Sequence, residues 1–91
     1  MNRSRFLTRV IAHGTQKAES LSKVPLVELA GQTRVLVENH IGVLGYSQNE
    51  VQIKVSYGKV VVSGSNLCFA QINRDQIVIT GQIEHLQLIR R

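Results

Sequence analysis

From Pro25 to the last residue, short apolar runs alternate with turn residues, and this pattern restricts the fold more than any other feature of the chain. Within it, apolar and polar residues alternate most clearly from Val51 to Ser56, the spacing of a strand that buries one face. The expected elements are, in chain order, Leu26–Ala30, Thr33–Asn39, Ile41–Tyr46, a hairpin over Glu50–Ser63 that turns at Tyr57-Gly58, Leu67–Ile72, Gln76–Thr80 and Gln82–Ile89. This density of strands leaves no room for crossover helices, so the sheet must be mostly antiparallel. We predict an all-β fold, a small antiparallel β-sandwich (immunoglobulin-like or roll) of about seven strands.

Size and composition agree with one compact domain of this class. The chain has 91 residues, is 43% hydrophobic and 19% charged, and has no Trp, so it has material for a single core and should fold. Its single thiol, Cys68, lies in an apolar run where a cysteine usually acts as a small buried hydrophobe. No stretch is apolar for the length of a membrane-spanning helix or of a secretory leader, so we expect neither insertion nor export.

The N-terminal segment differs from the rest in charge and pattern. Residues 1–24 carry five basic residues against Glu19, whereas residues 25–91 hold six basic and five acidic residues. Pro25 disfavours helix continuation, so we place the boundary between a basic arm, 1–24, and a β domain, 25–91, at that residue. In the arm, the spacing of Phe6, Leu7, Val10 and Ile11 predicts the apolar face of a short amphipathic helix, and Arg3, Arg5 and Arg9 would lie around the rest of it. We take these seven residues as the candidate partner-binding surface of the arm.

Such a helix is marginal alone and needs a surface on which to dock. The arm then packs on its own β domain, stays without regular structure, or contacts a partner protein or an anionic membrane surface. Because the β domain is nearly neutral and has no basic stripe with interleaved aromatic residues, we do not expect nucleic acid as a partner.

The segment Glu38-Asn39-His40, with Tyr46 shortly after it, is the most conspicuous polar cluster. A carboxylate, an imidazole and a phenol could line a small-ligand or acid–base site. A purely structural role explains the same residues more simply, because Glu38 and His40 would share one face of an extended strand and Asn39 suits a bend before a glycine. No zinc-ligand spacing, nucleophile elbow or phosphate-binding glycine loop occurs, so we predict no metal, no cofactor and no catalytic residue.

The run Gln76–Thr80 has no charged residue. If it forms an edge strand, its unpaired backbone groups favour self-association or strand addition. If it is a central strand, the lack of charge has no such consequence.

Two segments together resemble the YabP/YqfC family of sporulation proteins, in particular its YqfC-like branch. They are Pro25–Gly31 and Val35–Ser47, the latter containing Glu-Asn-His, two glycines and Tyr-Ser; the later pattern of Val60–Gly64 and Ile77–Gly81 is also similar. The resemblance implies an endospore-forming bacterium, expression in the mother cell and a part in spore cortex and coat formation. It implies a cytoplasmic location, with peripheral contact at the forespore membrane as an option, and no enzymatic activity.

Three functions follow, in order of preference. The first is a morphogenetic factor that binds a protein partner, such as a sporulation membrane protein, or forms a homo-oligomer. The second is a peripheral membrane adaptor that docks through its basic arm. The third is an enzyme or a small-ligand-binding module built on Glu38, Asn39, His40 and Tyr46.

Overall fold

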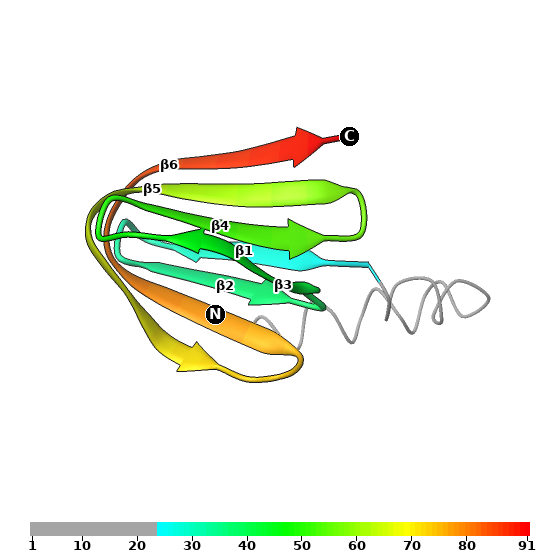
Figure 1. Cartoon of the computed structure of the whole chain (residues 1–91). Coiled ribbons are helices and arrows are strands. Elements are labelled where there is room, and N and C mark those ends of the chain that lie inside the picture. The colour runs from blue at the N-terminus through cyan, green and yellow to red at the C-terminus, as the bar shows by residue number, and fades with distance from the viewer. Residues whose placement is uncertain (1–23) are drawn as a thin grey trace.

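Six antiparallel strands form one continuous sheet in the computed structural model, which describes residues 24–91 (Figure 1). The order across the sheet is β1-β2-β6-β5-β4-β3. The strands are β1 (Leu26–Ala30), β2 (Arg34–Glu38), β3 (Gly42–Tyr46), β4 (Glu50–Val55), β5 (Gly58–Ile72) and β6 (Gln76–Arg90). Neighbours in sequence are mostly neighbours in space, as short turns between antiparallel strands require.

β5 and β6 are long strands, and the first and second half of each strand lie in different parts of the sheet. β2 pairs with β6 only over Gln76–Thr80, and β4 pairs with β5 only over Gly58–Ser63. Between these stretches the β5–β6 pairing shifts register at Ser63/Gly64 and again at Ser65/Cys68. Such bulges bend strands, and Figure 1 shows the sheet curving there so that its two halves face each other.

The core lies between these two halves. Ten side chains from β2, β4, β5 and β6 form one cluster with at most 1% exposure: Val35, Val37, Val51, Ile53, Val55, Val60, Val62, Leu67, Ile77 and Ile79. They alternate along their strands with residues of the outer face, as the period of two requires. No polar or charged side chain among residues 24–91 is buried, so hydrophobic burial of branched aliphatic residues is the main stabilising term.

The all-β antiparallel class is confirmed, but the sandwich arrangement and the count of about seven strands are not. The predicted strands 59–63 and 67–72 are one bent strand, β5, and 76–80 and 82–89 are likewise one strand, β6. The predicted arm and its helix lie outside the described residues.

Of the two alternatives for Gln76–Thr80, the central strand is the one observed, because the segment lies between β2 and β5, and its lack of charge fits that position. The prediction of a buried Cys68 was wrong. Cys68 is exposed and not buried; its Sγ lies 3.3 Å from the hydroxyl of Thr80, the residue opposite it on β6.

Residues 24–91 include no helix able to cross a membrane.

Candidate functional site

The β2–β3 connection and the β5–β6 turn meet at one end of the sheet. Asn39 adopts a left-handed backbone conformation, with φ of 61°, which asparagine tolerates better than most residues. This conformation ends β2 and lets the Asn39 N–H donate to the Asp75 carbonyl at 2.8 Å. The Asn39 side-chain amide donates to the Val24 carbonyl at 2.9 Å, so one residue connects the entry to β1, the end of β2 and the β5–β6 turn.

His40, the next residue, forms a further hydrogen bond to the β5–β6 turn. Its Nε2 lies 2.9 Å from the Asn73 carbonyl oxygen and must donate, since a carbonyl only accepts. Its Nδ1 is buried and has no hydrogen-bond partner among the described residues. One ring nitrogen is thus bonded to the backbone and the unpaired one is buried, so neither is open to a substrate in this conformation.

Glu38 lies beside this cluster and contacts the first residue of β6. The Gln76 side-chain amide donates to the Glu38 carboxylate at 2.8 Å, across a directly opposed pair of residues. An open hollow of about 430 Å³ is lined here by Glu38, Asn39, Asn73, Asp75 and Gln76. All five lining residues are polar or charged, whereas small-molecule sites are usually lined mainly by hydrophobic and aromatic side chains.

Tyr46 is not part of this cluster. It ends β3, while His40 precedes the start of that strand, and the two ends of β3 are separated by about 13 Å of extended chain. Its hydroxyl donates to the Leu67 carbonyl at 3.1 Å, and its ring lies 4.9 Å from that of Phe69. The structure therefore brings together Glu38, Asn39 and His40 but places Tyr46 at a second contact, between β3 and β5.

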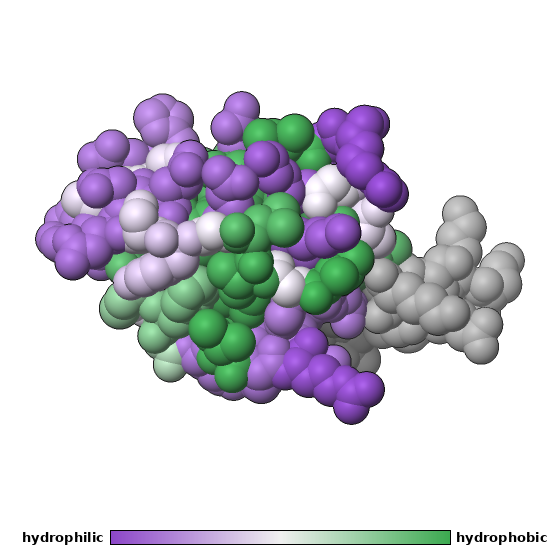
Figure 2. Space-filling view, in the orientation of Figure 1, coloured by the Kyte–Doolittle hydropathy of each residue, from purple (hydrophilic) through white to green (hydrophobic). Residues whose placement is uncertain are grey.

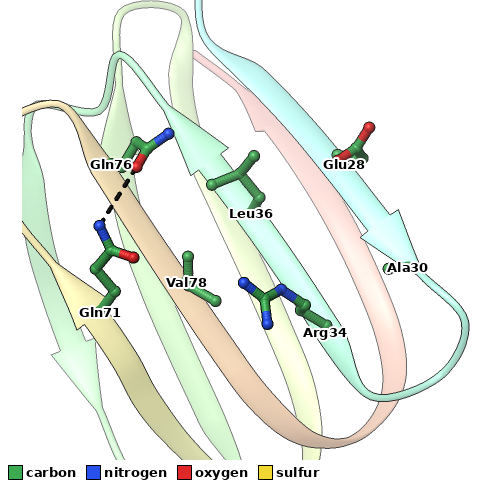
Figure 3. Close-up of a pocket in the computed structure, with 7 residues that line it drawn as sticks. All are labelled: Glu28, Ala30, Arg34, Leu36, Gln71, Gln76 and Val78. Carbon is green, nitrogen blue, oxygen red and sulfur yellow. Dashed lines mark hydrogen bonds between the residues drawn. The ribbon is translucent and has the colours of Figure 1, made fainter. Parts of the chain in front are cut away.

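A shallow hollow of about 130 Å³ opens on the outer face of β1, β2, β6 and β5. Figure 3 shows Leu36 and Val78 side by side between longer polar side chains, with Gln71 and Gln76 hydrogen-bonded to each other at 3.5 Å. Leu36 and Val78 are directly opposed across the strands and are 5% and 3% exposed. The polar side chains thus cover an apolar pair on the outer face, which is a packing role.

A third hollow, of about 250 Å³, was missed by the sequence interpretation. It lies where β4 turns into β5 and β6 ends, and it is lined by Leu44, Lys54, Gly58, Lys59, Ile89, Arg90 and Arg91. The turn at Ser56-Tyr57 opposes Lys54 to Lys59. The sequence could have revealed this lysine pair only through the exact position of the turn, because the turn fixes which residues of the hairpin oppose each other.

No group of His, Cys, Asp or Glu suited to a metal ion occurs among residues 24–91.

Fold and surface together define a small all-β protein with one bent sheet, polar connections and an exposed basic hollow. Residues 22–91 match the model of the YabP family, so the chain belongs to the YabP family. It is 29% identical over 66 residues to "Uncharacterized protein YqfC" of Bacillus subtilis (strain 168), covering 72% of this chain and 71% of that protein. No solved structure matches the chain. The predicted resemblance is confirmed; the family is associated with sporulation and is not a known enzyme family.

Proposed function

We propose that this protein is a non-enzymatic sporulation factor that acts in the mother cell during spore cortex and coat morphogenesis by binding a protein partner or a second copy of itself. Family membership supports the sporulation part. The single observation that carries the binding part is the exposed edge strand β3.

β3 presents unpaired backbone groups together with apolar side chains. It pairs with β4 on one side, and no other strand among the described residues pairs with its second side. β3 carries no charged residue, and Ile41, Val43 and Leu44 are 58%, 41% and 55% exposed. Natural sheets usually protect such an edge with charge or use it for assembly.

The register of β3 favours one defined partner over open-ended assembly. A bulge between Val43 and Gly45 interrupts its pairing with β4. A bulged edge does not offer the regular ladder that repeated strand addition needs. An extended segment of a partner would pair over part of β3 and pack on the exposed apolar side chains, as in strand addition.

The test is a pull-down from sporulating cells with the tagged full-length protein, followed by mass spectrometry. Val43→Lys places a charge at the edge and should remove the partner recovered by the natural protein. Leu29→Lys is the matched control, because Leu29 is 47% exposed and lies on β1, the strand at the opposite edge of the sheet from β3. Equal recovery by the two variants would refute a β3 docking site.

The arm provides a second candidate function, a peripheral membrane adaptor. Residues 1–24 hold four of the five excess positive charges of the chain, and each basic residue near an anionic membrane contributes about 1 kcal/mol. A parallel pull-down with residues 25–91 separates the two candidates. Loss of a membrane protein from this shorter chain would assign docking to the arm, and its retention would assign docking to the β domain.

A further inference from the structure

The basic residues of the β domain are concentrated at one place. Residues 24–91 contain six of them, Arg34, Lys54, Lys59, Arg74, Arg90 and Arg91. Four of the six, Lys54, Lys59, Arg90 and Arg91, line the hollow at the β4–β5 turn and the end of β6. None of the described residues that line it is acidic. A domain that is nearly neutral by count therefore has a strongly positive surface at one end.

Two of these cations lie opposite each other, and no acidic side chain of residues 24–91 is among the residues that line the hollow with them. Lys54 and Lys59 are directly opposed in the β4–β5 hairpin, an arrangement that is destabilising for like charges. The Lys59 ammonium donates to the neutral Gln52 amide oxygen at 3.0 Å, which satisfies a hydrogen bond but does not neutralise the charge. A bound anion would remove this repulsion.

Most of the surface that lines the hollow is apolar, and the charged ends of the basic side chains lie around it. Lys59 is opposed to Ile89 of β6, so Lys54, Lys59 and Ile89 form a row across three strands. Leu44, on the β3 bulge, lies at the same hollow with more than half of its side chain exposed. Figure 2 shows strongly hydrophilic surface at the C-terminal end of the described chain, with hydrophobic surface directly beside it.

We propose that this basic hollow docks on the anionic phospholipid headgroups of a membrane surface, with Leu44 reaching between the headgroups. Phosphate groups would lie against Lys54 and Lys59, and lysine and arginine side chains can keep their charged ends at the headgroup level while their methylene stems cover apolar surface. The hollow would supply a second membrane contact, distinct from the arm.

The layout of the charges favours a membrane over an acidic peptide. The cations come from β4, β5 and the end of β6, and so form a patch across strands and not a line along one strand. Lys54 and Lys59 lie side by side on one face of two neighbouring strands, so a planar anionic surface can contact both. The Arg90 guanidinium lies over the Tyr57 ring at 4.9 Å and Arg91 donates to the Ser56 carbonyl, so these two add positive charge beside the lysine pair. An extended peptide on the β3 edge would run parallel to the strands, with Arg90 and Arg91 three strands away in the sheet order. This proposal does not depend on a protein partner at β3.

The test measures partition of the full-length protein into sedimented vesicles at low ionic strength. The vesicles are phosphatidylcholine alone or with about one quarter phosphatidylglycerol. Lys54→Gln together with Lys59→Gln should reduce binding to the anionic vesicles by about 30-fold, the value for two basic residues at a membrane surface. Arg34→Gln with Arg74→Gln is the matched control, since it removes the same charge from β2 and the β5–β6 turn and should have a much smaller effect.

A second pair of variants tests the apolar contact without changing the charge. Leu44→Ser should weaken binding several-fold, whereas Leu29→Ser, at an exposed position of β1, should not. Circular dichroism of each variant checks folding. Equal losses for the two double variants would overturn the proposal, because binding would then follow net charge alone. Hollow-dependent binding of a soluble Glu- and Leu-containing peptide, with no difference between the double variants on vesicles, would also overturn it and indicate an acidic protein segment instead.

Discussion

Asn39 shows how one residue can fix the arrangement of distant segments. Its left-handed backbone stops β2, its N–H bonds to the Asp75 carbonyl, and its side chain bonds to the Val24 carbonyl. A general preference of asparagine for bends predicts the first of these properties. The other two depend on segments 15 or more residues away, which the sequence pattern does not place.

The backbone and side-chain contributions of Asn39 can be separated by two substitutions. Asn39→Gly keeps the left-handed conformation and loses the bond to Val24, which should cost about 1 kcal/mol of unfolding free energy. Asn39→Ala loses the bond and also strains the backbone, so it should cost about 1 kcal/mol more. Urea unfolding followed by circular dichroism measures both. Equal losses would mean that the backbone conformation contributes little.

Gly81 is required where β6 passes close to β5. Its φ is 139°, and a Cβ atom there would lie 2.6 Å from the backbone oxygen of Asn66. Gly81→Ala should therefore lower the unfolding free energy by about 2 kcal/mol or more. Gly42→Ala is the control, because nothing lies within 4 Å of a Cβ at Gly42, and it should change stability by less than about 1 kcal/mol. Thermal unfolding of the two variants side by side would contradict this if their midpoints fell equally.

Among the elements, the β4–β5 hairpin shows why register is harder to predict than strand existence. The alternation in Val51–Val55 correctly predicts a half-buried strand, and the hairpin over Glu50–Ser63 is confirmed. The turn, however, is at Ser56-Tyr57 and not at Tyr57-Gly58. A turn one residue later would place Lys54 opposite Val61, and the two lysines would no longer face each other, since a shift in register changes every pair of opposed residues. The basic hollow was therefore not predictable from strand patterns.

The opposed lysines make a direct prediction for hairpin stability. Lys59→Glu places a carboxylate opposite Lys54 and should raise the unfolding free energy by about 0.5 kcal/mol at low salt, even though the bond to Gln52 is lost. The gain should shrink as salt screens the pair. Urea titrations at low and at high ionic strength measure it. A loss of stability at both would show that the repulsion in the natural protein is negligible.

The long strands explain the remaining difference between the predicted and observed elements. Glycine and polar residues at 64–66 and at Gly81 resemble turns in the sequence, but both strands continue through them with bulges. A bulge and a turn use the same residue types; what distinguishes them is the partner strand, which is a tertiary property. The same limit applied to Gln76–Thr80, whose lack of charge fitted either an edge or a centre until β2 was placed beside it.

For the whole molecule, the important consequence of the bend is that one core joins both halves of the sheet. Ile79 and Val35 come from the half that contains β2, and Ile53 and Val62 come from the half that contains β4, yet all belong to one cluster with no exposed side chain. Among the described residues, the buried hydrophobic side chains outside this cluster are only Leu36, Val61 and Val78, which are too few to form a separate core in either half. The two halves should therefore unfold together, as small single-core domains usually do.

Hydrogen exchange can test this cooperativity with a small core change. Ile79→Val removes one methylene group on the β2 side and should cost about 1 kcal/mol. If the core unfolds as one unit, amides of β4 should lose protection by about fivefold, to the same extent as amides of β2, because both exchange through the same global opening. Val43→Ala at the exposed edge is the control and should leave both sets nearly unchanged. Loss of protection in β2 with β4 unaffected would show that the halves open separately and that the bend at Gly64 and Gly81 acts as a hinge between two units.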